Sequence, residues 1–405
     1  MISYGIDNIE QYDAWLQGKK IALITNPTGI NRELKSTIDV LNERYEVTLL
    51  FSPEHGVRGD KQAGEHVRTY VDEKTGIEVF SLYGKTRIIP ETLNDRYDVL
   101  IYDIQDTGSR FYTYISTLLN CLKSCALNQK PFMVLDRPNP IGGHIVEGNY
   151  ITPELLSFVG CFEMPQRYGL TPGEFVMMAN DKLKLGCNLQ VVKMSGYERQ
   201  LFFDEMDLIF VNLSPNIPSV VTEVLYNGTC LFEGTCLSEG RGTTKPFEVI
   251  GAPWIRGEEL AGRMNKLQLP GVVFRPTYFT PTFSKHQGMM CEGVQIHVTD
   301  AKLVQAVEVG VHLLEETKKM TTDRDFFISP PFESDEAFFD KLCGTKEIRL
   351  GKLSFSDYLV KCKEDAKVFE KEKVNYHLYI YSENRRVCYD ISEFKFRGDY
   401  DGSEQ

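Results

Sequence analysis

The 405-residue sequence lacks several features that would each point to a class of protein. No apolar run approaches the roughly 20 residues that span a bilayer. The start of the chain, MISYGIDNIEQYDAW, has neither the basic residues nor the apolar core of a signal peptide. As the sequence stands, we expect a cytoplasmic protein without a membrane span, and a periplasmic or extracellular protein if a leader has been trimmed. An excess of basic residues is also missing, since the net charge is −12. An acidic chain has no bulk attraction for phosphate backbones, so we expect no nucleic-acid partner.

Signatures of metal and nucleotide binding are missing as well. Cys121 and Cys125 are the close pair among ten cysteines, and no second Cys/His pair follows at the spacing of a zinc site. After the first apolar run the chain reads TNPTGIN, where a dinucleotide-binding protein has G-x-G-x-x-G. We expect neither a metal nor another cofactor, and we expect most cysteines to be small core residues in a reducing compartment.

What the sequence does contain is a series of short apolar runs, separated by polar turns and helix-like stretches. The runs lie within residues 19–29, 45–56, 77–87, 97–110, 131–143, 189–194 and 207–218. Near-continuous apolar strands between helices indicate a parallel sheet that is covered on both faces. The sequence therefore predicts an α/β fold with a doubly wound, Rossmann-like parallel sheet.

The pattern changes near residue 252. Turns and short alternating strands follow to about residue 300, and helical stretches are predicted near 301–319, 333–343 and 354–371. We expect a Rossmann-like catalytic domain over residues 1–251 and a smaller α+β domain over residues 252–405 that completes a cleft.

Polar side chains follow most of the predicted strands. Ligands of doubly wound sheets bind beyond the carboxyl ends of the strands, so we expect these side chains to surround one cleft. In chain order they are Asn26; Glu54, His55 and Arg58; Asp103, Asp106 and Arg110; Asp136, Arg137 and Asn139; and Asn216.

The carboxyl groups in this set suit acid–base chemistry. Hydrolysis of a glycosidic bond requires a proton donor at the leaving oxygen and a second carboxylate. Glu54 follows the stiff Pro53 and is the candidate donor, and the candidate partners are Asp103, Asp106, Asp136 and Glu147. Alternatively, Asp103 or Asp106 caps the helix that begins near Arg110, and Asp136 pairs with Arg137. His55 titrates near neutral pH and either polarises the substrate or holds its loop.

Two later segments add candidates for substrate binding. In SEGRGTTKPF (238–247), Arg241 lies between two glycines, with Glu239 and Thr243 beside it. A guanidinium in that setting suits bidentate capture of a carboxylate or phosphate, and the alternative is a structural ion pair. RYGLTPGEF (167–175) is typical of a helix start with a capping box, which leaves Tyr168 free to stack on a sugar ring.

Several segments together resemble one known family. FSPEHGVRGD, SLYGKTR, YDIQDTGSRFYTYISTL, VLDRPNPIGG, RYGLTPGEF, LSPNIPS and EGTCLSEGRGTTKPFEVIGAPW occur in this order. They resemble the exo-β-N-acetylmuramidase family of bacterial cell-wall recycling, over about residues 5–381. The resemblance implies a Rossmann-like domain and a smaller C-terminal domain with the site between them. It also implies release of N-acetylmuramic acid from the non-reducing end of peptidoglycan fragments.

The resemblance further assigns roles to residues. It implies that Glu54, in the PEHG motif, is the catalytic residue, here the general acid/base. Because muramic acid carries a lactyl carboxylate, an arginine in the cleft is expected to bind it. Arg241 is the first candidate, and Arg58, Arg110 and Arg137 follow.

The sequence departs from the family in two ways, and two other functions stay open. Many relatives carry export signals, and Cys236 stands where we expect asparagine or a similar polar residue. One alternative is a non-catalytic carbohydrate-binding protein that senses wall fragments. The other is a metal-dependent hydrolase or transferase that uses His55, Asp103 and Asp136.

Overall fold

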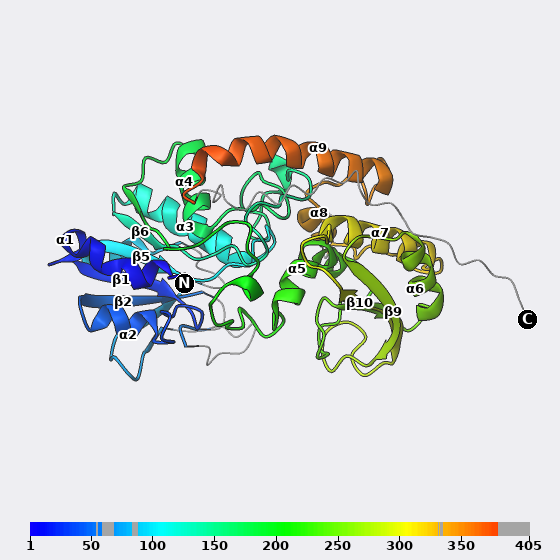
Figure 1. Ribbon diagram of the computed structural model, residues 1–405, viewed down its shortest axis with the longest axis horizontal. Coiled ribbons are helices and arrows are strands. Elements are labelled where there is room, and N and C mark those ends of the chain that lie inside the picture. Colours follow the sequence, from blue (N-terminus) through cyan, green and yellow to red (C-terminus); the bar gives the residue numbers. More distant parts are fainter. Residues whose placement is uncertain (54–55, 59–68, 83–87, 331, 333–334, 380–405) are drawn as a thin grey trace, which may run out of the picture.

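The computed structural model describes residues 1–53, 56–58, 69–82, 88–330, 332 and 335–379. Within these residues the chain forms two parts, each built around its own sheet (Figure 1). The longest helix, α9 (Phe355–Lys373), runs along the top of both parts in this view. In the portion of the chain that is described, no helix has the length and apolar character needed to cross a membrane.

The larger sheet has the strand order β3-β4-β2-β1-β5-β6-β7 in the described residues. Neighbouring strands pair in parallel, except for the antiparallel pair β3–β4. The order reverses between β1 and β5, which makes this the topological switch point of a doubly wound sheet and confirms the predicted fold class. The strands are β1 (Lys20–Thr25), β2 (Glu46–Ser52), β3 (Tyr70–Val71), β4 (Glu78–Ser81), β5 (Val99–Asp103), β6 (Phe132–Leu135) and β7 (Leu189–Val192).

Helices cover both faces of this sheet. Successive residues of a strand point to opposite faces, so alternate residues of β1 enter two different cores. Ile24 packs with α3 (Thr113–Leu127) and α4 (Pro172–Lys182). Leu23 packs with the 3₁₀ helix η1 (Gly5–Tyr12) and with α2 (Thr37–Asn42) on the other side. Burial on both faces explains why the strands read as near-continuous apolar runs.

The prediction of a strand over residues 207–218 is wrong. This segment is irregular between η4 (Phe203–Glu205) and α5 (Val220–Thr229), apart from one isolated bridge between Ser214 and Ile217. Pro215 and Pro218 have no N–H group to donate to a ladder. Leu213 and Ile217 of this segment are buried without pairing with the sheet.

The second part is a smaller α+β unit, as predicted. Its antiparallel sheet has the order β8-β10-β9 and packs against α6 (Gly257–Lys266). β8 lies at the predicted domain boundary between residues 251 and 252, and that boundary stays a prediction. The remaining elements are β8 (Val249–Ala252), β9 (Val272–Phe279), β10 (Cys291–Val298), α7 (Ala306–Lys319) and α8 (Phe338–Cys343).

Helix α5 lies between the two parts and touches α7 at backbone distance (Figure 1). The contact is made by glycines, Gly228 on α5 and Gly310 on α7. A Cβ atom on Gly228 would lie 1.9 Å from the carbonyl oxygen of Ala306, and one on Gly310 would lie 2.4 Å from the carbonyl oxygen of Gly228. No side chain larger than hydrogen fits at either position, so α5 is held at a fixed place against the second part.

Candidate functional site

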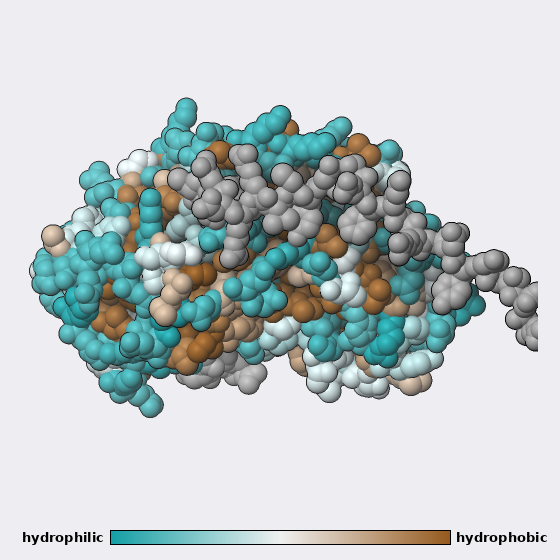
Figure 2. Space-filling view, viewed as in Figure 1, coloured by the Kyte–Doolittle hydropathy of each residue, from teal (hydrophilic) through white to brown (hydrophobic). Residues whose placement is uncertain are grey.

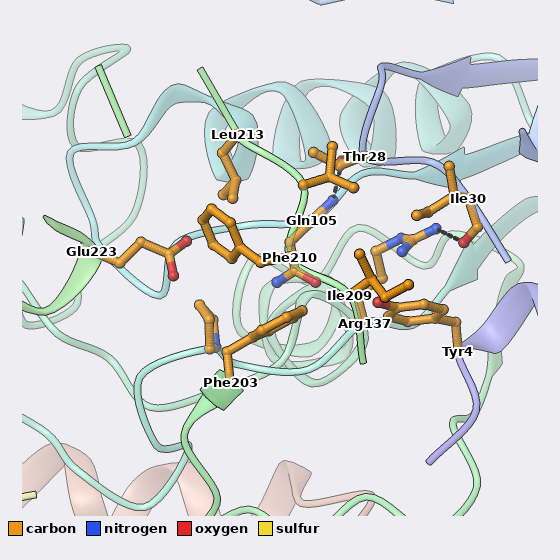
Figure 3. Close-up of a pocket in the computed structure, with 12 residues that line it drawn as sticks. Tyr4, Thr28, Ile30, Gln105, Arg137, Phe203, Ile209, Phe210, Leu213 and Glu223 are labelled. Carbon is orange, nitrogen blue, oxygen red and sulfur yellow. Dashed lines mark hydrogen bonds between the residues drawn. The ribbon is translucent and has the colours of Figure 1, made fainter. Parts of the chain in front are cut away.

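A pocket lies at the switch point of the large sheet, between the ends of its strands and helix α5 (Figure 3). The loops after β1, β5 and β6 form one wall, and the irregular segment before α5 covers the pocket. Hydrophobic residues gather over the middle of the face shown in Figure 2, with hydrophilic residues around them. The residues that line the pocket include Thr28, Gln105, Arg137, Phe203, Phe210, Leu213 and Glu223.

Asp103 and Arg137 form a buried ion pair beside this pocket. Nη2 of Arg137 donates to Oδ2 of Asp103 at 2.8 Å and to the carbonyl oxygen of Ile30 at 2.8 Å. Oδ2 of Asp103 also accepts from the hydroxyl of Thr37. The guanidinium lies 4.5 Å from the centre of the Tyr4 ring. These contacts fix the loops after β1, β5 and β6 against one another.

Asp106 has one oxygen engaged and one open. Its Oδ2 accepts from the backbone N–H of Gly108 at 2.9 Å and from the hydroxyl of Tyr168. Its Oδ1 has no hydrogen-bond partner among the described residues. Burial raises the pKa of Asp106 to about 6. Tyr168 is therefore tied to a carboxyl group by its hydroxyl, and Asp106 keeps an acceptor for another group.

Two neighbouring amides are also incompletely paired. Nε2 of Gln105 donates to the carbonyl oxygens of Pro138 (2.7 Å) and Asp106 (2.8 Å), which leaves Oε1 without a partner. Oδ1 of Asn26 accepts from the N–H of Thr28 at 3.0 Å, and its Nδ2 has no partner in the described part of the chain. Buried polar atoms in proteins are rarely left unpaired, so such a cluster is typical of a site for a polar ligand.

Asp136 and Asn139 are, by contrast, fully engaged with their surroundings. Asp136 accepts from the hydroxyls of Thr171 (2.8 Å) and Tyr379 (2.7 Å) and from the N–H of Gly173 (2.7 Å). Burial raises its pKa to about 7. The amide of Asn139 donates to the carbonyl oxygen of Leu170 at 3.0 Å. Both side chains hold the loop before α4, where the structure confirms the predicted capping box.

Arg110 and Glu147 connect the two parts of the molecule. Arg110 is buried and donates to the carbonyl oxygens of Asn149 (2.7 Å), Met164 (2.7 Å) and Leu342 (3.0 Å), the last of which lies in α8. Burial lowers its pKa to about 10. Glu147 pairs with Arg167 at 2.5 Å and accepts from the N–H of Val307 in α7 at 3.0 Å.

Of the predicted site residues that the structure describes, Arg137 lines the pocket, and Arg241 and Thr243 lie elsewhere. Arg241 pairs with Glu233 at 3.0 Å and with Glu239 at 3.5 Å, and its guanidinium lies 5.0 Å from the centre of the Phe247 ring. The hydroxyl of Thr243 donates to the carbonyl oxygen of Gly240 at 2.6 Å. Arg241 and Thr243 precede β8 in the chain, and their assignment to substrate binding stays a prediction.

Arg58 and Asn216 complete that group. Nε of Arg58 donates to Asp72 at 2.6 Å, and a weaker contact of 3.4 Å joins its Nη2 to Asp39. Asn216 is half-buried in the irregular segment before α5. Neither residue lines the switch-point pocket, and their roles also stay predictions.

Glu54 and His55 lie outside the described residues. Strand β2 ends at Ser52, so the PEHG motif does begin at the carboxyl end of a strand. Across the described ranges, no group of three or more His, Cys, Asp and Glu side chains is arranged to hold a metal ion.

One carboxyl group at the pocket was not predicted. Glu223, on α5, is fully buried, and neither of its oxygens has a partner in the described chain. The signal available in the sequence was an acidic residue within VVTEVLYNG, a helical stretch that is otherwise without charge. A helix that is apolar on all sides is expected to be buried, so a charge within it requires an explanation.

Comparisons with known proteins agree over nearly the whole chain. The family model "Exo-beta-N-acetylmuramidase NamZ, N-terminal" matches residues 21–221, and "Exo-beta-N-acetylmuramidase NamZ, C-terminal" matches residues 224–379. Peptidoglycan beta-N-acetylmuramidase NamZ of Bacillus subtilis (strain 168) is 46% identical over 351 residues, which cover 86% of this chain and 83% of that protein.

Two solved structures have the same fold. Both are crystal structures of DUF1343 family proteins from Bacteroides fragilis NCTC 9343. One is 38% identical with a TM-score of 0.86, and the match covers 94% of this chain and 99% of that chain. The other is 30% identical with a TM-score of 0.75, covering 94% and 100%.

Proposed function

Because the chain belongs to the exo-β-N-acetylmuramidase NamZ family, we propose that it is a glycoside hydrolase that acts on peptidoglycan fragments. In this proposal it releases terminal N-acetylmuramic acid from the non-reducing end. The observation that carries the proposal is the 46% identity, over 86% of the chain, to a peptidoglycan beta-N-acetylmuramidase. The predicted division at residues 251 and 252 is part of the same proposal, with the second domain completing the cleft.

Glu54 is the proposed general acid/base. As the bond from the anomeric carbon to the leaving oxygen breaks, the proton of Glu54 moves to that oxygen. Water then adds its hydroxyl to the anomeric carbon, and its other proton returns to Glu54 or passes to the second carboxylate. A second carboxylate acts as base, nucleophile or stabiliser of the positive charge that develops on the sugar ring.

The contacts of the candidate carboxylates favour Asp106 for that second role. Asp103 is paired with Arg137, Asp136 accepts from several donors, and Glu147 is paired with Arg167. Asp106 alone among these four has an oxygen without a partner in the described structure. A carboxylate must have an open oxygen to meet a sugar or a water molecule.

Release of sugar from a chromogenic N-acetylmuramide tests the proposal. We expect Glu54→Gln to lower kcat/KM by about 100-fold or more, which is the scale of general acid–base catalysis. Glu46→Gln is the matched control, because Glu46 is exposed at the opposite end of β2 and is expected to leave the rate unchanged. Full activity in the Glu54 variant would refute its assignment.

The same assay separates the other two functions. Saturable binding of N-acetylmuramic acid without turnover at any pH would favour a carbohydrate-binding protein. Loss of turnover on addition of a chelator, restored by a divalent metal, would favour a metal-dependent hydrolase.

A further inference from the structure

Glu223 has none of the contacts that normally stabilise a buried carboxyl group. It lies in the first turn of α5, where an acidic side chain often accepts from free backbone N–H groups. Ser219 already has that role, because its Oγ accepts from the N–H of Thr222 at 3.2 Å. No described lysine, arginine or backbone N–H group reaches either oxygen of Glu223. Helix capping therefore does not explain this residue.

Keeping such a group in the interior costs stability. Burial raises the pKa of Glu223 well above its ordinary value, and the charge of Asp106 adds to the effect. Burial without a counter-charge favours the protonated form of this carboxyl group, which has one O–H donor and open acceptor positions. A leucine of similar size would remove the unpaired polar atoms altogether. Residues that lower stability in this way occur mainly at functional sites.

The surroundings of Glu223 point to a polar ligand. In Figure 3 its carboxyl group points into the pocket, toward the Phe210 ring, with Leu213 and Phe203 on either side. Gln105 lines the same pocket and carries an acceptor without a described partner. One turn further along α5, the side-chain oxygen of the buried Asn227 also has no described hydrogen-bond partner. Gln105, from the sheet, and Glu223, from the helix, thus bring open polar atoms to the same pocket.

We propose that Glu223 is a sugar-contacting residue of this site, and that its carboxyl group exchanges hydrogen bonds with a hydroxyl of the bound N-acetylated sugar. The proposal rests on the proposed glycosidase function. A hydroxyl both donates and accepts, and it carries no charge, so it matches a neutral carboxylic acid. It also matches the amide of Gln105. A charged ligand group would instead require a buried counter-charge at Glu223.

The covering segment can give way to a sugar. Phe210 and Leu213 lie over Glu223 in a stretch that makes no strand ladder. Moving their side chains breaks no sheet hydrogen bonds. The contact to Glu223 forms as the sugar takes the place of these apolar groups, and the aromatic ring of Phe210 remains available to pack against a sugar face.

Two substitutions at this position test the proposal. Glu223→Leu removes both hydrogen-bonding functions, whereas Glu223→Gln keeps a neutral donor and acceptor of the same shape. We expect Glu223→Leu to raise KM by about tenfold or more, the scale of one or two lost hydrogen bonds, with kcat within about threefold of wild type. We expect Glu223→Gln to keep KM within about threefold. The melting temperature of the leucine variant is expected to equal or exceed that of wild type.

A matched control is Glu258→Leu, since Glu258 is an exposed glutamate in the first turn of α6. It is expected to change neither KM nor kcat. Wild-type KM in Glu223→Leu would overturn the proposal. A fall in kcat of about 100-fold in Glu223→Gln with unchanged KM would also overturn it, because that pattern belongs to proton transfer.

Binding measurements separate this proposal from the proposed function. Titration calorimetry with N-acetylmuramic acid gives the affinity of each variant without any turnover. If wild type hydrolyses no glycoside but binds the sugar about tenfold more tightly than Glu223→Leu, the contact is supported and the glycosidase function fails. If wild type hydrolyses the substrate, and Glu223→Leu and Glu223→Gln both bind the sugar as tightly as wild type does, only the proposed contact at Glu223 fails.

Discussion

Replacing Arg110 with methionine should destabilise the whole molecule without weakening substrate binding. Its guanidinium is buried and donates to three backbone carbonyl oxygens, two in the first part and one in α8 of the second. Methionine keeps much of the aliphatic volume and removes every donor. The three carbonyl groups would then lose their charged partner in the interior.

The expected loss follows from opposing effects. A hydrogen bond to a charged group contributes about 1.5–3 kcal/mol, so three of them set an upper range of about 5–9 kcal/mol. The substitution also removes a buried charge that is not paired with any described carboxylate. Because burying that charge costs free energy, its removal offsets part of the loss. We expect a net loss in the free energy of unfolding of about 3–5 kcal/mol, the scale of breaking a buried charged contact.

Urea unfolding measures this loss. The chain has two tryptophans, Trp15 in the first part and Trp254 in the second, so fluorescence and circular dichroism together follow both parts. Arg263→Met is the control, because Arg263 forms exposed ion pairs and its loss should cost less than about 1 kcal/mol. A loss below about 1 kcal/mol in the Arg110 variant, or a raised KM at unchanged stability, would show that Arg110 binds substrate instead.

Two further predictions concern the packing of α5 and the electrostatics of Asp106. Gly228→Ala puts a Cβ atom 1.9 Å from the carbonyl oxygen of Ala306 and should lower the free energy of unfolding by about 2 kcal/mol or more. At Gly262, on α6, a Cβ atom would meet nothing within 4 Å, so Gly262→Ala should instead stabilise the protein by up to about 1 kcal/mol. Equal urea midpoints for the Gly228 and Gly262 variants would contradict the close contact between α5 and α7. Asp106 has its pKa raised from 3.8 to about 6, so its protonated form favours the folded state at low pH, and this contribution is lost as the pH rises from about 4 to about 6. Asp106→Asn cannot titrate, so the stability of wild type relative to this variant should fall by about 2–3 kcal/mol between pH 4 and pH 7, and parallel pH curves would refute the raised pKa.

Much of the fold was predictable because burial on both faces leaves a strong pattern. The strands near residues 20, 47, 100 and 133 are nearly continuous apolar runs, and each was predicted. The run at 207–218 has the same local composition but no sheet partner. A local pattern records that side chains are buried, and it does not record what they are buried against.

The site was predicted less completely, for a similar reason. Asp103 and Arg137 do meet at the switch point, because strand ends bring them there, and Arg137 lines the pocket. Whether a carboxyl group has all its hydrogen bonds depends on partners far along the chain. Tyr168, which donates to Asp106, is an example. Glu223 comes from a helix beyond the sheet, and only the tertiary structure brings that helix to the pocket.

Buried polar contacts between the two parts also limit how the sequence of such a chain can change in evolution. Arg110 reaches Leu342, Glu147 reaches Val307, and Lys373 donates to the carbonyl oxygens of Gly143 and Gly169 at 2.7 Å. The two segments matched by the N- and C-terminal family models therefore share one interior. A hybrid that joined one half of this chain to the other half of a distant relative would have to match every donor with its carbonyl group. Exchange of halves by recombination is thus disfavoured, and new specificities are expected to arise by point substitution around the pocket.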